Sequence, residues 1–142
     1  MYELLKGFHN LLRWIVVLGG AWALVLMIRG LATQARWTAT EVTATRIFTY
    51  GLHLQLLVGL VLYAVTPLLS GGMSARLSDR LLLIEHGGTM LLAVIAAQLG
   101  TSLARRAKTD RAKFLRATIG YFAAGLLIVW ATPWGRAIVP WS

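Results

Sequence analysis

The chain has 142 residues, of which 58% are hydrophobic and only 13% are charged, and its mean hydropathy is +0.69. This length suits one compact domain and not two, and the apolar fraction exceeds that of ordinary soluble proteins. The formal net charge is +9. Because the chain has no cysteine, it cannot form disulfides, iron–sulfur clusters or thiolate-ligated metal sites.

Four long apolar segments follow one another along the chain, each close to the ~20 residues that an α-helix needs to cross a ~30 Å hydrocarbon core. A soluble helix is seldom apolar on every face over such a length. The first segment lacks the short apolar core and the cleavage site of a signal peptide, so we expect it to stay as a helix. The sequence predicts an all-α membrane protein with transmembrane helices at about 8–30, 40–67, 79–103 and 110–134.

Short polar motifs indicate where these helices begin and end. Thr38 and Glu41 fit a capping box that starts the second helix, and Pro67 should end that helix because proline disfavours its continuation. Start and end signals for the last two helices are Ser78, Thr109 or Asp110, and Pro133. A Ser-Gly-Gly turn at 70–72 separates the second helix from the third. With short connections, neighbours pack antiparallel, which predicts one up-down-up-down bundle over residues 1–142.

Basic residues gather in two of the three connections. The segment 104–116 holds six Lys or Arg residues against one Asp, and the segment 29–46 holds three Arg against one Glu. The positive-inside rule places both segments in the cytoplasm and both termini outside. Anionic lipids of the inner leaflet account for this charge, so the expected partner is membrane lipid and not nucleic acid.

All three histidines, His9, His53 and His86, lie in or beside different apolar segments. Ionisable side chains inside a membrane are costly, by roughly 2.5–3.5 kcal/mol for a charge at its centre, and they tend to face the bundle interior and mark a function. Each histidine could instead lie near an interface and hydrogen-bond a backbone carbonyl. The functional interpretation is a haem, because imidazole is a standard axial ligand of its iron and a four-helix bundle can hold a porphyrin.

Two axial ligands of one iron must lie at similar depth in the membrane. With a rise of ~1.5 Å per residue, His9 and His86 both fall near the outer ends of their helices, whereas His53 is displaced by about 10–15 Å. We therefore predict His86 as one ligand and His9, rather than His53, as the other. Arg13, one turn from His9, could bind a haem propionate or Glu85. Glu85 could also accept a proton near a quinone, or lie among the headgroups.

Other features leave alternatives open. Gly20, Ala93 and Ala97 lie below the two predicted ligands at helical spacing and could leave room for a flat macrocycle, or could serve close helix packing. Arg46 lies two turns from His53 on the same helical face, and Tyr50 and Gln55 are nearby. This setting could bind a quinone head group, a second haem, or nothing. The fourth helix carries no histidine and is predicted to be a scaffold.

Three segments, FHNLLRW, HLQLLVGLVLY and IEHGGTMLLAV, resemble those of small bacterial four-helix membrane proteins labelled cytochrome b or cytochrome b-like. The resemblance covers most of the chain and implies a haem b protein of the bacterial inner membrane that exchanges electrons with a quinone or a redox partner. Carried over residue by residue, the resemblance implies that His9, His53 and His86 are the candidate haem-site histidines, with Arg13 and Glu85 as supporting groups. Larger di-haem cytochromes pair histidines on one helix, a pattern absent from this sequence.

The sequence therefore predicts a small haem b electron carrier, with no catalytic residues of its own, that forms a homo-oligomer or a subunit of a larger membrane redox complex. A second hypothesis is a non-catalytic accessory or assembly subunit of a respiratory or photosynthetic complex, in which a histidine could ligate a chlorophyll magnesium. A third is a metal or proton carrier that uses the histidines and Glu85, although the chain lacks a dense ligand cluster. Colour after purification separates the first hypothesis from the other two.

Overall fold

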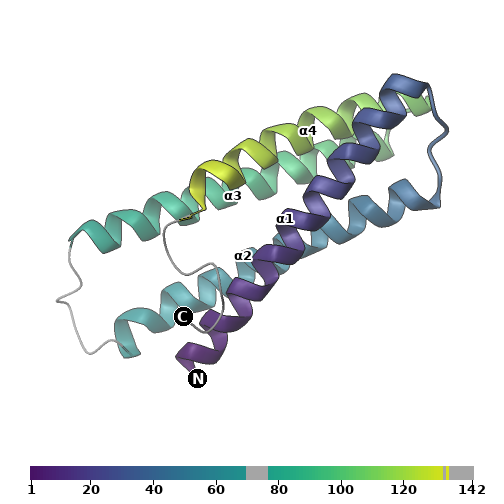
Figure 1. The fold of residues 1–142 in the computed structure, drawn as a ribbon. Coiled ribbons are helices and arrows are strands. Elements are labelled where there is room, and N and C mark those ends of the chain that lie inside the picture. Colours follow the sequence, from purple (N-terminus) through teal and green to yellow (C-terminus); the bar gives the residue numbers. More distant parts are fainter. Residues whose placement is uncertain (70–76, 133, 135–142) are drawn as a thin grey trace.

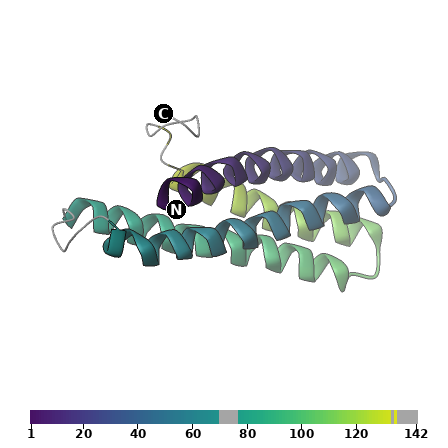
Figure 2. The same cartoon turned by 90° about the horizontal axis from the view of Figure 1, so that it is seen from below.

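The computed structural model describes the backbone of residues 1–69, 77–132 and 134, and the side chains of residues 1–65, 84–132 and 134. Four helices are present in these ranges, α1 (Tyr2–Thr33), α2 (Ala39–Leu69), α3 (Leu77–Arg105) and α4 (Asp110–Ala131). Figure 1 shows them as long rods packed side by side, and Figure 2 shows the bundle from a perpendicular direction. Helix α1 contacts α2 and α4, and α3 contacts the same two helices, so the four surround a common interior.

Each helix is long and apolar enough to cross a membrane, which confirms the prediction of an all-helical chain with four helices of this kind. Even α4, the shortest with 22 residues, measures about 33 Å at ~1.5 Å per residue, slightly more than a ~30 Å hydrocarbon core. The outward-facing residues are also apolar: Leu18, Val25 and Ile119 are each more than 60% exposed. A surface of this kind is costly in water and suits contact with lipid chains.

The helix ends follow local capping chemistry. The capping box is confirmed, because the backbone N–H and the hydroxyl of Thr38 donate to Glu41 Oε2 over 2.8 and 2.6 Å. At the start of α4, Thr109 Oγ1 accepts from the N–H of Ala112 over 3.2 Å. Helix α2 runs to Leu69, two residues beyond its expected end at Pro67, since proline removes one hydrogen bond without forbidding helical backbone angles. The predicted turn at 70–72 and Pro133 lie outside the described residues. Helix α3 begins at Leu77, one residue before the expected cap at Ser78, whose side chain is not among those described.

The small residues below the predicted ligands serve packing. A Cβ at Gly20 would lie 2.6 Å from Cε2 of Phe48, so the Phe48 ring occupies the space beside this glycine. Ala93 and Ala97 are fully buried in the core. Of the two roles open for these residues, the structure shows close packing, as is common between helices in membranes.

A buried chain of three hydroxyls joins α2, α3 and α4. The Thr101 hydroxyl lies 3.0 Å from that of Thr49 and 2.7 Å from that of Tyr121. All three residues are at least 96% buried. Because each hydroxyl hydrogen-bonds to a neighbouring hydroxyl, these bonds link the three helices at one level of the bundle.

Replacing Thr101 with valine should lower the free energy of unfolding by about 1–2 kcal/mol, because the shape is kept while the hydroxyls of Thr49 and Tyr121 lose their common partner. Unfolding by a denaturing detergent added to mixed micelles would measure this. The matched control is Thr118→Val, since the Thr118 hydroxyl bonds only to the carbonyl of Phe114 within its own helix. Equal losses in the two variants would contradict a stabilising role for the interhelical chain.

Candidate functional site

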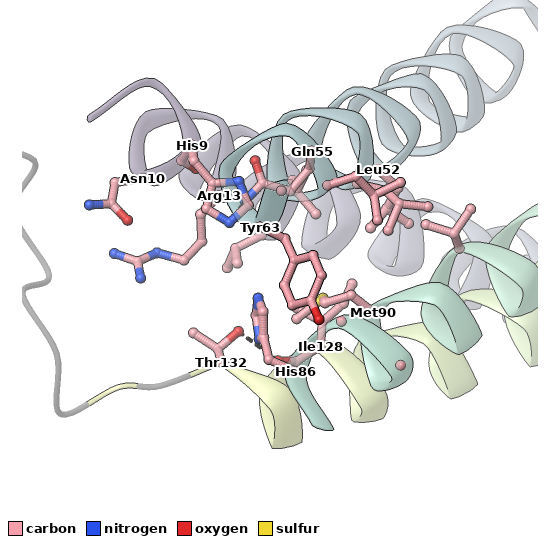
Figure 3. Close-up of a pocket in the computed structure, with 18 of the residues that line it drawn as sticks. His9, Asn10, Arg13, Leu52, Gln55, Tyr63, His86, Met90, Ile128 and Thr132 are labelled. Carbon is pink, nitrogen blue, oxygen red and sulfur yellow. Dashed lines mark hydrogen bonds between the residues drawn. The ribbon is translucent and has the colours of Figure 1, made fainter. Parts of the chain in front are cut away.

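A cavity of about 450 Å³ lies between the four helices, within the size range of small-molecule sites, roughly 300–1,000 Å³. All four helices contribute to its wall. Its polar lining includes His9 and Arg13 of α1, Gln55 of α2, His86 of α3 and Thr132, which follows α4. Figure 3 shows these side chains around one space, with apolar residues along the rest of the wall.

His9 and His86 approach each other across this cavity. Their ring centroids are 6.5 Å apart and their planes meet at 78°. Figure 3 shows the two rings reaching in from opposite walls. Two imidazoles from two different helices therefore lie at the same level of the bundle.

His86 is held in a single orientation by the end of α4. Its Nδ1 lies 2.8 Å from the carbonyl oxygen of Ala131. A carbonyl can only accept a hydrogen bond, so Nδ1 carries the proton and Nε2 of the neutral ring keeps its lone pair. Histidines that bind metals are commonly oriented in this way, by a hydrogen bond from the other ring nitrogen. The prediction that α4 is only a scaffold therefore missed this carbonyl, which a search for side chains does not detect.

His9 is held by Gln55 of α2. The Gln55 Nε2 lies 3.1 Å from the backbone oxygen of His9 and 3.3 Å from His9 Nε2, so the amide can donate to both atoms. The sequence had suggested that Gln55 belongs to the surroundings of His53. The structure gives it a different histidine, because Gln55 faces the interior and His53 is exposed on the outside of α2.

Two polar atoms of this pair are buried without a hydrogen-bond partner among the described residues, namely His9 Nδ1 and Gln55 Oε1. A buried polar atom left unpaired costs about 1–3 kcal/mol. Such a cost is typical of sites arranged for function rather than for stability.

Gly59 of α2 allows the His9 ring to lie directly against that helix. A Cβ at this position would be 3.2 Å from His9 Cε1 and 3.8 Å from His9 Nδ1. Gly87 and Gly88 line the opposite wall, and a Cβ at either would meet nothing within 4 Å. These three glycines were not predicted from the sequence, although the Gly-Gly pair directly after His86 was a usable signal.

The other predicted residues lie in different places. Arg13 lines the cavity with Lys6 and Asn10, so two cations border it. His53 and Glu85 are exposed and do not line the cavity. The structure thus gathers His9, His86 and Arg13 at one site and separates His53 and Glu85 from them.

Among the side chains that the structure describes, those of residues 1–65, 84–132 and 134, no group of three or more His, Asp or Glu is close enough to hold a metal ion. A haem is a different case, since its iron takes only two axial protein ligands. Two imidazoles on opposite sides of one iron place their centroids roughly 6 Å apart, with metal–nitrogen bonds of about 2.0–2.1 Å and about 1 Å from each nitrogen to its centroid. The observed 6.5 Å and the available Nε2 of His86 fit this group. Ligation by His9 would require its Nε2 to leave the Gln55 amide.

Comparisons of the chain with protein-family models, with curated proteins and with solved structures found no match. The function of the chain is therefore inferred from the cavity and from the residues that line it.

Proposed function

We propose that this chain is a haem b-binding electron-transfer protein of the bacterial inner membrane, with His86 and His9 as the axial ligands. The observation that supports this most is the pair of imidazoles from α1 and α3, 6.5 Å apart across a cavity of about 450 Å³. When bound, a haem would supply reversible one-electron chemistry.

The residues around the cavity would position the group and set its potential. The Ala131 carbonyl orients the His86 ring and makes its Nε2 more basic. Arg13 would form charge-assisted hydrogen bonds with a propionate, as guanidinium groups do with carboxylates. The apolar wall, which includes Leu52, Val94 and Ile128, would exclude water and so favour the less charged redox state.

The proposal includes a topology. The helices would run up-down-up-down, with the basic segments 29–46 and 104–116 in the cytoplasm and both termini outside, as the positive-inside rule favours. His9 and His86 lie in the first third of α1 and α3, so the cavity would lie toward the outer surface. A quinone in the membrane or a redox partner on that side would then exchange electrons with it.

A dithionite-reduced minus oxidised absorption spectrum of the detergent-purified protein tests the proposal. We expect a sharp haem b band from protein expressed with ample haem. A featureless spectrum from folded, haem-replete protein would end the proposal. Co-purification with a larger membrane complex would then favour an accessory subunit.

Gly59→Ala should weaken haem binding by about fivefold, because the new methyl group pushes the His9 ring by a few tenths of an ångström and such overpacking costs about 1 kcal/mol or more. The matched control is Gly51→Ala in the same helix, where a Cβ would make an ordinary 3.5 Å contact with Val16. Haem titration of the two variants measures the difference. Equal affinities would show that the position of His9 against α2 is unimportant for the bound group.

A further inference from the structure

The end of the bundle that carries the two short connections has a large excess of positive charge. Figure 2 shows the α1–α2 and α3–α4 connections at this same end. The segments 29–46 and 104–116 contain nine Lys or Arg residues and only two carboxylates, Glu41 and Asp110. Glu41 is occupied by the Thr38 cap, and Asp110 pairs with Lys113 over 3.4 Å. These two segments hold no further carboxylate for the remaining cations, of which Arg116 donates to the carbonyl of Leu103 over 3.0 Å.

A second cavity, of about 290 Å³, lies at this end between the last turn of α1, the connection that follows it and the start of α4. Arg36 and Arg111 border it from two different segments, and its lining also includes Asp110, Gly30, Leu31, Gln34 and Ala35. Both arginines are exposed, and neither guanidinium group has a hydrogen bond or ion pair with the described residues. The lining thus holds two guanidinium groups, one carboxylate that pairs with Lys113 over 3.4 Å, and a small apolar wall.

The shape of this cavity is held by packing, independently of the arginines. The Phe114 ring occupies the position that a Cβ at Gly30 would take, so α1 and α4 meet closely there. Trp37, in the connection, packs on the Phe114 ring with centroids 5.0 Å apart. The N–H of Ala35 donates to the Gly30 carbonyl over 3.0 Å. The connection is therefore fixed against α4, and Arg36 and Arg111 border a preformed space.

We infer that this cavity binds a phosphate group, carried by the headgroup of an anionic phospholipid. Two guanidinium groups from different segments match the oxygens of a phosphate, because each can donate parallel hydrogen bonds. Leu31 and Ala35 give the adjoining glycerol and acyl carbons an apolar surface. The position, at the ends of membrane-crossing helices, is where headgroups lie, and basic pockets between such helices bind anionic lipids. This inference does not depend on a haem.

The test is a titration of the full-length protein in neutral detergent micelles, with bound lipids counted by native mass spectrometry. The probes are dioleoylphosphatidylglycerol, dioleoylphosphatidylcholine and sodium phosphate. The pocket variant combines Arg36→Gln with Arg111→Gln. Its matched control combines Arg106→Gln with Lys108→Gln, which removes two exposed charges from the same end outside the cavity.

We expect one tightly bound phosphatidylglycerol per chain and an affinity loss of about tenfold or more in the pocket variant, against less than about threefold in the control. Equal losses in both variants would overturn the inference, since the charge would then act only as a diffuse field. Phosphatidylcholine bound as tightly as phosphatidylglycerol would also overturn it. If inorganic phosphate bound as tightly as phosphatidylglycerol and its binding were lost in the pocket variant, the ligand would be free phosphate, and the inference of a lipid headgroup would be overturned.

Discussion

His86→Ala will abolish haem binding, with a loss of affinity greater than about 100-fold. Removing a group that merely orients a ligating histidine typically costs about 10–100-fold, and this change removes the ligand itself. His86 is the histidine whose Nδ1 is committed to the Ala131 carbonyl, so its Nε2 would be the atom that binds the iron. The ratio of haem to protein after purification, and the reduced-minus-oxidised spectrum, measure the effect. This prediction rests on the proposed function.

The two remaining histidines serve as graded comparisons. His9→Ala should weaken binding and change the spectrum to that of a haem with one protein ligand, because His9 must also give up its Gln55 hydrogen bond to ligate. His53→Ala should leave both affinity and spectrum unchanged, since His53 is exposed and outside the cavity. Loss of haem in His53→Ala with retention in His86→Ala would refute the ligand assignment while leaving a haem protein.

Gly120→Ala will destabilise the bundle by about 2–3 kcal/mol, at the upper end of the usual cost of overpacking. A Cβ at Gly120 would lie 2.5 Å from the Cα of Gly100 and 2.8 Å from the carbonyl oxygen of Ala96. Both obstacles are backbone atoms of α3, so no side-chain rotation relieves the clash and the two helices must separate. Close approach of backbones through small residues is a main source of helix association in membranes. Unfolding by a denaturing detergent measures the loss.

The matched control is Gly125→Ala in the same helix. A Cβ at Gly125 would meet nothing within 4 Å, so we expect no loss, and alanine even favours the helix over glycine. A similar loss in both variants would indicate that glycine matters in α4 for its flexibility. A loss confined to Gly120→Ala would establish the backbone contact with α3 as its cause.

The helices were predictable because their causes are local. A membrane requires long apolar segments whose backbone groups bond within the segment, so hydropathy alone located α1 to α4. The caps at Thr38 and Thr109 were also predictable, since each is a contact between residues two to three positions apart. The exact helix boundaries were less predictable. Helix α1 begins at Tyr2, well before the expected start at about residue 8. Polar residues near a membrane surface do not stop a helix.

The neighbours of each side chain depend on how every helix is rotated about its axis. Contact with lipid does not determine this rotation, because several faces of each helix are apolar. The rotation is set by tertiary contacts such as Phe48 on Gly20 and Gly100 on Gly120. These contacts turn Gln55 toward His9 and leave His53 exposed, which no spacing along α2 could reveal.

By itself, the sequence determined that this chain is all-helical and has four helices suited to a membrane, because length and hydropathy are summed within each segment. It also supplied His9, His86 and Arg13 as candidates, since ionisable groups among apolar residues stand out in any arrangement. Only the tertiary structure decided that the two imidazoles approach to 6.5 Å, that Ala131 orients one and that Gln55 holds the other. Those contacts join residues about 45 positions or more apart in the chain, and only the packing of all four helices brings them together.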